Sequence, residues 1–174
     1  DNIIPGLKTG RYDVALSNIN ATPTRLKQID FVGYYNASLL GIISRKDADI
    51  APFKSLSDVC GKEVGAGSGT TQVTRLEEAS KACEAAGKQP IKVAIFPDRP
   101  AGVQAVVSGR VPLFLGPYEG LLWQTKVIKP LTMSGEITVN DAPVSVAFPK
   151  DSPLEPAVQA ALNSLIKDGS YRKI

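Results

Sequence analysis

Short apolar runs bounded by glycine, proline and polar residues alternate along this chain with longer segments whose apolar residues recur every three or four positions. The first pattern predicts buried strands, and the second predicts amphipathic helices. Strands that alternate with helices in this way favour an α/β fold with mostly parallel sheets covered by helices. The predicted strands are residues 13–17, 29–31, 38–44, 62–66, 91–96, 111–115 and 144–148.

Helix boundaries are marked by capping residues. Thr22 followed by Pro23 predicts a helix start with threonine as N-cap and proline at the first helical position. Apolar residues recur at helical spacing from position 73 to 86, and Gly87 predicts the end of that helix. Residues 152–155 (SPLE) predict a capping box before a last helix that ends at Gly169. The other predicted helices are residues 2–8, residues 101–108 and a helix that begins at Tyr118.

Composition excludes several classes of protein. Hydrophobic residues make up 43% of the 174 residues and charged residues 21%, which is typical of a globular chain. The longest apolar stretches fall far short of the about 20 residues that a membrane-spanning helix needs. The net charge of +3 is scattered along the chain, so we expect no nucleic-acid partner. The chain has no histidine, which excludes Ser-His-Asp and Cys-His nucleophiles and His-based zinc sites, and we expect neither a metal nor a cofactor.

The chain has two cysteines, Cys60 and Cys83. They are either a disulfide or two buried free thiols, and an even number of cysteines favours a disulfide in an exported protein. A bridge would close a loop of roughly 20 residues and stabilise the fold by about 3 kcal/mol. The chain begins in the middle of a pattern, without an initiator methionine, which indicates either a processed protein or a fragment.

A small-residue loop, residues 67–71 (GSGTT), stands between a predicted strand and a predicted helix. The start of a helix presents backbone N–H groups and the positive end of the helix dipole, which suits a carboxylate or a phosphate. Gly69 would let the backbone approach a ligand, and Thr70 and Thr71 would add hydroxyl groups. The loop is neither a P-loop nor a dinucleotide fingerprint. It is therefore either an anion site or a tight turn with a helix N-cap.

A second candidate follows the first predicted strand. Ser17, Asn18 and Asn20 lie where an open α/β sheet places its ligand crevice. Arg25 lies in the first turn of the next helix, where the helix dipole disfavours a cation, so arginine there indicates an anionic partner such as a carboxylate. The alternatives are a solvated arginine or one paired with Asp30. Two anion-suited segments on separate βα units predict a cleft between two lobes that closes on a small carboxylate.

Several segments, taken in order, resemble the extracytoplasmic solute-binding proteins of amino-acid-type ABC importers, the bacterial solute-binding protein family 3. Residues 1–13 (DNIIPGLKTGRYD) resemble the family's D-x-L-I-P-A-L-x-S-G-K-Y-D, and residues 22–31 resemble T-x-E-R-x-K-x-V-D-F. Residues 56–71 are similar to L-x-D-L-x-G-K-x-V-G-V-x-x-G-T-T. The resemblance extends over nearly the whole chain.

The resemblance implies a type II periplasmic-binding fold with two parallel-rich sheets flanked by helices. Residues 1–45 and 142–174 would form lobe 1, and residues 46–141 would form lobe 2, with crossovers near residues 44–47 and 140–143. Family members carry roughly 50 more residues before the point where this chain starts, so lobe 1 would be incomplete. A cysteine pair placed like Cys60 and Cys83 is similar to that of actinobacterial members, which again favours a disulfide.

The family also implies a function, which is the extracytoplasmic substrate-binding component of an ABC transporter. Such a protein would be secreted, either periplasmic or a lipoprotein anchored at the cell surface, and monomeric. Its partners would be a small polar carboxylate, an amino acid or a related compound, and an ABC permease of the inner membrane. The alternatives are an enzyme on the same scaffold, such as an exported cyclohexadienyl or arogenate dehydratase, and the ligand-sensing module of a receptor.

The resemblance assigns roles residue by residue. The ligand carboxylate would meet Arg25 and Thr71, together with Gly69 and Thr70 of the same loop. Ser17, Asn18 and Asn20 would bind the amino or carboxylate group of the ligand, and no catalytic residue is expected.

This chain departs from the family at the position that binds the ligand's ammonium group. The family reads G-R-V-D-A-x-x-x-D, but this chain has Pro112 and Pro117 in place of the two acids. Glu119, which follows Pro117 by two residues, is the candidate to replace the missing acid.

Overall fold

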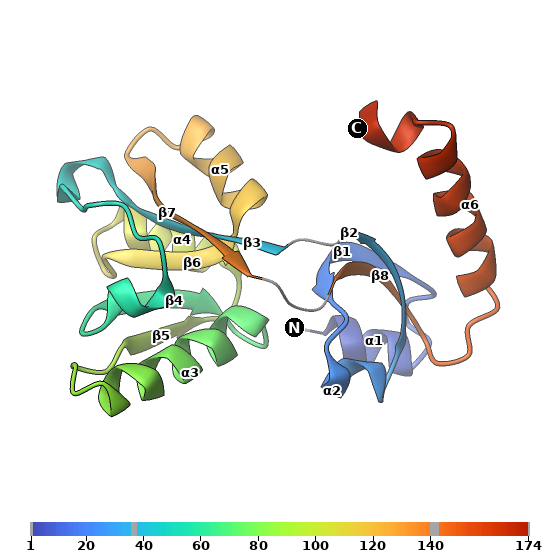
Figure 1. The fold of residues 1–174 in the computed structure, drawn as a ribbon, viewed down its shortest axis with the longest axis horizontal. Coiled ribbons are helices and arrows are strands. Elements are labelled where there is room, and N and C mark those ends of the chain that lie inside the picture. The colour runs from blue at the N-terminus through green and yellow to red at the C-terminus, as the bar shows by residue number, and fades with distance from the viewer. Residues whose placement is uncertain (1, 36–37, 140–142, 174) are drawn as a thin grey trace. The chain divides into compact units, whose positions relative to one another are not determined.

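The computed structural model describes residues 2–35, 38–139 and 143–173 (Figure 1). The chain divides into two compact units: Leu39–Val139 forms the larger, and Asn2–Ser38 with Asn140–Ile174 forms the smaller. Each unit has its own sheet and its own hydrophobic core. The expected α/β class, with sheets flanked by helices, is confirmed.

The smaller unit is built on a three-stranded sheet with the order β1-β8-β2. The strand β8 runs antiparallel to both of its neighbours, whereas we predicted a parallel-rich sheet. The two strands joined by α2 do run in the same direction, as in a βαβ unit, but β8 from the distant end of the chain occupies the position between them. The elements are α1 (Ile3–Lys8), β1 (Ala15–Asn20), α2 (Pro23–Leu26), β2 (Asp30–Tyr35), β8 (Val144–Phe148), α6 (Glu155–Lys167) and the 3-10 helix η3 (Ser170–Lys173).

The two faces of this sheet have separate apolar cores. One core, which includes Leu7 of α1, also contains Ile19, Ile29 and Ala147. The other contains Val32, Val146 and Phe148, and it is covered by Val158 and Leu162 of α6. The alternation of side chains along each strand places these two sets on opposite faces.

The last helix begins two residues later than the predicted capping box requires. Helix α6 starts at Glu155 with Leu154 at the N-cap, and no side chain caps it. The hydroxyl of Ser152 instead accepts a hydrogen bond from the backbone N–H of Leu154 at 3.3 Å. Serine readily forms such a local turn, which competes with N-capping, and Pro156 then lies in the first helical turn, where its missing N–H is harmless.

The larger unit contains a five-stranded sheet with the order β5-β4-β6-β3-β7. The strand β4 is parallel to β5 and to β6, while β3 is antiparallel to β6. Residues 39–45, which we expected in lobe 1, lie in β3 and therefore belong to this sheet. The elements are β3 (Ser38–Arg45), η1 (Lys46–Ala48), η2 (Leu56–Val59), β4 (Glu63–Gly67), α3 (Thr71–Ala85), β5 (Lys92–Phe96), α4 (Arg99–Val107), β6 (Leu113–Pro117), α5 (Tyr118–Val127) and β7 (Leu131–Val139).

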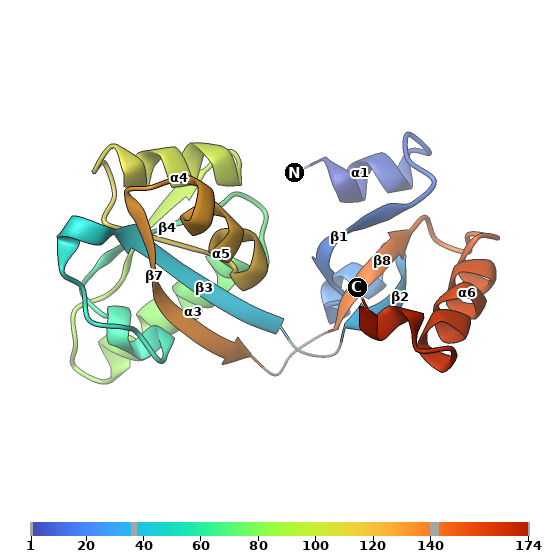
Figure 2. The same cartoon turned by 90° about the horizontal axis from the view of Figure 1, so that it is seen from above.

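Helices cover both faces of this sheet, and Figure 2 shows α3 and α4 on opposite sides of it. Leu113 and Leu115 of β6 pack in the core that α3 covers, whereas Phe114 packs in the core that α4 and α5 cover. Gly102 of α4 lies directly on the ring of Phe114, because a Cβ at this position would overlap the ring. The sheet is thus buried on both faces, as its near-continuous apolar strands predict.

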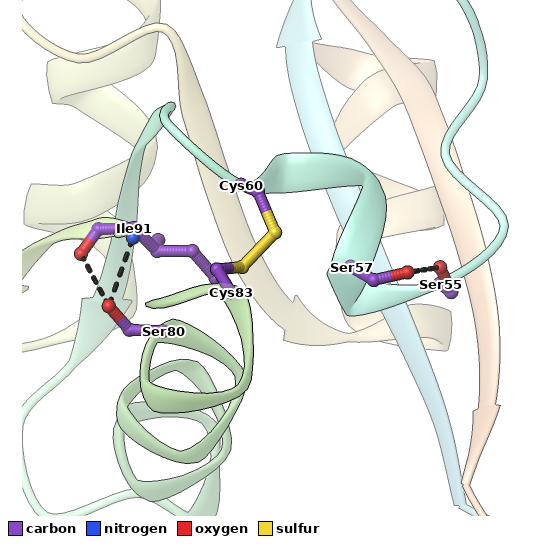
Figure 3. Close-up of a disulfide and its surroundings, with 6 residues drawn as sticks. All are labelled: Ser55, Ser57, Cys60, Ser80, Cys83 and Ile91. Atoms are coloured by element: carbon purple, nitrogen blue, oxygen red, sulfur yellow. Dashed lines mark hydrogen bonds between the residues drawn. A yellow bond between two sulfur atoms is a disulfide. The ribbon is translucent and has the colours of Figure 1, made fainter. Parts of the chain in front are cut away.

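The predicted disulfide is confirmed (Figure 3). It joins Cys60, which follows η2, to Cys83 in α3, with the Cα atoms 5.8 Å apart. Ser80 holds the same helix to the start of the β5 segment, because its hydroxyl donates to the carbonyl of Ile91 at 3.2 Å and accepts from its N–H at 3.0 Å. The disulfide and this pair of hydrogen bonds together fix α3 against the sheet.

Replacing both cysteines with serine should lower the free energy of unfolding of the larger unit by about 3 kcal/mol, because the bridge closes a loop across a sequence separation of 23 residues. Urea denaturation followed by the fluorescence of Trp123, the single tryptophan of the chain, measures this change in the unit concerned. The Ser57→Ala variant is the control, since it removes an exposed hydroxyl that is hydrogen-bonded to Ser55. An unchanged unfolding midpoint in the double variant would contradict the prediction.

The start of β2 is tied to the segment between β8 and α6. The carboxylate of Asp30 accepts hydrogen bonds from the ammonium of Lys150 at 2.5 Å and from the backbone N–H of Asp151 at 2.7 Å. The hydrogen bond from Lys150 is the main reason why the pKa of Asp30 lies below its usual value. Asp30 is thus the partner of Lys150, and it links two segments of the smaller unit that are distant in the sequence.

The lowered pKa of Asp30 makes the stability of the smaller unit depend on pH. Because the folded-state pKa lies below the unfolded-state value, the contribution is complete at neutral pH and is lost progressively as the pH falls below about 5. We expect the Asp30→Asn variant to be less stable than wild type at neutral pH and to lose part of this acid sensitivity. Circular dichroism during denaturation at several pH values measures it, with Asp13→Asn, an exposed carboxylate, as the charge control. Parallel pH profiles of wild type and Asp30→Asn would refute this assignment.

Candidate functional site

Three parallel strands of the larger unit end at one edge of its sheet. Gly67 at the end of β4 is paired with Phe96 at the end of β5. Gly65 is paired with Phe114, so the end of β4 lies level with Gly116, close to the end of β6. Each of these strands leads within a few residues into a helix. Since open α/β sheets bind ligands at the carboxyl ends of their strands, this edge is the candidate site. It includes Gly69, Thr70 and Thr71 as well as Glu119, so the structure brings these predicted residues to one edge.

The turn from β4 to α3 is held by its own hydrogen bonds. The N–H of Ser68 donates to the carbonyl of Phe96 at 2.7 Å, and the hydroxyl of Thr70 donates to the carbonyl of Gly67 at 2.7 Å. Thr70 occupies the N-cap position, but its side chain does not cap the helix, because its hydroxyl is directed back to the turn. Thr70 thus shapes the turn, and the half-buried Thr71 is the first residue of α3.

Gly69 is the residue of this turn that needs the conformational freedom of glycine. The φ angle of Gly69 is +65°, in the left-handed region. Gly67 lies in an extended strand, and a Cβ there would lie 3.4 Å from the Thr70 side chain, which is an ordinary van der Waals distance. The Gly69→Ala variant should therefore lose about 1 kcal/mol of stability. The matched variant Gly67→Ala should lose less, and denaturant unfolding compares the two. Equal losses would show that backbone strain at position 69 is not the cause.

Glu119 lies in the first turn of α5 and is exposed. A carboxylate there is stabilised by the helix dipole, and it is available to a cationic group of a ligand. The preceding residue, Tyr118, has a pKa above its usual value, mainly because its hydroxyl is hydrogen-bonded to Glu136 of β7. That interaction joins α5 to the sheet next to Glu119.

The smaller unit brings Asn20 and Arg25 together at the end of β1. Thr22 is the N-cap of α2, as predicted, and its hydroxyl oxygen accepts from the backbone N–H of Arg25 at 3.4 Å. The Nη1 of Arg25 donates to the backbone carbonyl of Asn20 at 3.2 Å, so the half-buried guanidinium lies over the strand end. Burial away from water lowers the pKa of Arg25. The planar fork of a guanidinium has a geometry that suits a carboxylate.

The other predicted residues of β1 differ in their surroundings. Asn20 is buried, with 8% of its surface exposed, whereas Ser17 is exposed and its carbonyl accepts a hydrogen bond from the hydroxyl of Tyr34 at 3.0 Å. The side chain of Asn18 lies outside the described part of the structure, as do three residues of the predicted crossover, 140–142. Tyr34 is held in turn by Tyr171 of η3, whose hydroxyl donates to the carbonyl of Tyr34.

Sequence reasoning missed Arg99, which lies at the same sheet edge as the β4–α3 turn. We predicted the fourth helix from residue 101, but α4 begins at Arg99 with Asp98 as N-cap, since the Asp98 carboxylate accepts from the N–H of Ala101 at 2.8 Å. The signal was present, because an aspartate followed two residues later by Pro100 is a typical helix start. Arg99 is half-buried, and burial lowers its pKa.

Two kinds of feature are absent from the described part of the chain. No group of three or more cysteine or acidic side chains among residues 2–35, 38–139 and 143–173 could hold a metal ion. Within the same ranges, no helix has both the length and the apolar character needed to cross a membrane.

The sequence matches the family model of bacterial extracellular solute-binding proteins, family 3, over residues 1–174. Among curated proteins it is similar to an arginine-binding protein of Corynebacterium glutamicum, with 26% identity over 175 residues, which cover 99% of this chain and 56% of that protein. The chain thus spans little more than half the length of this relative.

Two solved structures share the fold of nearly the whole chain. An ancestral arginine-binding protein bound to arginine has a TM-score of 0.81 and 32% identity, covering 99% of this chain and 74% of that one. An ancestral amino acid-binding protein, described as a precursor of cyclohexadienyl dehydratase, has a TM-score of 0.78 and 29% identity, covering 99% of this chain and 71% of that one.

Proposed function

Because the chain belongs to the bacterial extracellular solute-binding proteins of family 3, we propose that it is the substrate-binding component of an ABC importer for an amino acid or a related small carboxylate. The observation that carries this proposal is the family match over the whole chain, which confirms the resemblance found in the sequence, and the type II periplasmic-binding fold agrees with it. The names of the relatives, which describe arginine and amino acid binding, support the class of ligand.

The residues proposed to contact the ligand are found in both units. Arg25 binds the ligand carboxylate through its planar fork, a geometry that suits two parallel hydrogen bonds. The start of α3 at Thr71 provides backbone and hydroxyl donors for the same kind of group, with Gly69 and Thr70 shaping the turn. Glu119 binds the ligand's ammonium group, since the family's acids are replaced by prolines here. The remaining proposed contacts are Ser17, Asn18 and Asn20.

The protein acts by binding, without making or breaking a bond. The competing proposal is a dehydratase on the same scaffold, which the similarity to a dehydratase precursor favours. Such an enzyme needs a positioned general acid, and Glu119 is the candidate in the proposed site. Product formation from a cyclohexadienyl acid that disappears in Glu119→Gln would favour the enzyme over the binding protein.

Three features of the cellular setting belong to the same proposal. The protein lies outside the cytoplasm, periplasmic or anchored by a lipid, and delivers its ligand to an ABC permease of the inner membrane. The disulfide supports this setting, because such bridges persist in oxidising compartments. The working form is a monomer.

We expect an amino acid ligand to stabilise the complete protein by about 2.7 kcal/mol when its concentration is a hundred times the dissociation constant. Thermal denaturation with a panel of amino acids and organic acids measures this shift. Arg25→Gln should abolish it, and Lys27→Gln, an exposed charge at the end of the same short helix, should retain it. Because Arg25 also donates to the carbonyl of Asn20, the unliganded stability of both variants is measured as well. If no compound in the panel shifts the melting temperature of the wild type, the proposed function is wrong.

A further inference from the structure

Arg99 is a half-buried cation outside the set of residues proposed above to hold the ligand. Its guanidinium lies against Gly120 in the first turn of α5. A Cβ at Gly120 would overlap Nη1 of Arg99 and would lie 3.4 Å from Cζ and 4.0 Å from Nη2. The absence of a side chain at Gly120 therefore provides the space that the guanidinium occupies, and any larger residue there would displace it.

The strand order determines where this guanidinium lies within the larger unit. Arg99 follows β5 and Gly120 follows β6, while β4 lies between these two strands. The helices α4 and α5 cover the same face of the sheet, and this contact joins their first turns. The guanidinium therefore lies at the carboxyl edge of this sheet, the edge where the ligand is proposed to bind.

The charge of Arg99 is not compensated within the described part of the larger unit. None of the ion pairs formed by the described residues includes Arg99. The neighbouring carboxylate, that of Asp98, instead accepts from the backbone N–H of Ala101. The lowered pKa of Arg99 has burial as its cause, which means that the charged group has lost water without gaining an anion. A guanidinium in this position is suited to form a charge-assisted hydrogen bond with an anionic partner.

Asp98 and Glu119 are the acidic residues at the starts of α4 and α5, and the carboxylate of Asp98 is engaged in capping α4. The strand β6 and its flanking residues carry Pro112 and Pro117 rather than acids, which leaves Glu119 for the ammonium group of an amino acid. A cationic side chain, such as that of arginine, would then face Arg99 with the same sign of charge. A ligand with a second anionic group would instead form a charge-assisted hydrogen bond with the guanidinium.

We infer that Arg99 determines the specificity of the site by binding a second carboxylate, so that the preferred ligand is an amino acid with an acidic side chain. This inference rests on the proposed function, because it assumes that an amino acid binds at the carboxyl edge of the larger unit. It separates this chain from the relatives named for arginine, whose ligand carries the opposite side-chain charge.

Isothermal titration calorimetry of the complete protein with L-glutamate, L-aspartate, L-glutamine and L-arginine tests the inference. The wild type should bind an acidic amino acid roughly tenfold or more tightly than its amide or arginine. Arg99→Gln should remove this preference while leaving the affinity for L-glutamine within about threefold, because only the second carboxylate loses its partner. Arg99→Lys, which keeps the charge without the planar fork, should retain part of the preference.

The control is Lys92→Gln, which removes an exposed charge at the opposite end of β5, where Lys92 pairs with Glu63 at 3.2 Å. Its selectivity should equal that of the wild type. A purely structural role of Arg99 would weaken the binding of every ligand by the same factor and would overturn the inference. Preference of the wild type for L-glutamine or L-arginine would overturn it too, but would leave the proposed function intact. Failure of all four amino acids to bind would overturn the inference, and failure of the whole panel of amino acids and organic acids would overturn the proposed function as well.

Discussion

The parallel register of β5, β4 and β6 is the constraint on which the candidate site of the larger unit depends. Gly67 pairs with Phe96 and Gly65 with Phe114, so the three strands end at nearly the same level and the turns after them share one edge. Both faces of β6 are buried, with Leu113 on one face and Phe114 on the other. A slip of one residue would exchange the faces of every side chain and would move Phe114 away from Gly102, where the absence of a side chain makes room for its ring, so this packing holds the register.

The smaller unit positions Arg25 by a different means. Helix α2 has only four residues, and it is held by the Thr22 cap and by the hydrogen bond from Arg25 to the carbonyl of Asn20. The strand that ends at Asn20 is in turn fixed by β8, which enters the sheet from the far end of the chain. The orientation of the guanidinium thus depends on a strand that lies more than a hundred residues away in the sequence.

The charges at the proposed site favour an acidic amino acid as the ligand, rather than arginine, the ligand in the names of the relatives. Prolines replace the family's two acids, and the half-buried guanidinium of Arg99 reaches the same sheet edge through the space left by Gly120. The family match establishes the scaffold and the class of protein, but the ligand is selected by individual side chains, which vary while the scaffold stays the same. Specificity in this chain is therefore a question of which charges its own loops present.

The sequence by itself determined the local features: the Thr22–Pro23 helix start, the turn from β4 into α3, the end of α3 at Gly87 and the family. These features depend on residues that are neighbours in the sequence, and the capping and turn preferences of those residues predict them directly. Tertiary structure decided the position of β8 between β1 and β2, the strand β7, and the contact of Arg99 with Gly120. The two residues of that contact are 21 positions apart and meet only because the strand order brings the ends of β5 and β6 to either side of β4. Sequence spacing alone contains no such information, because pairing between distant strands depends on the packing of the whole sheet.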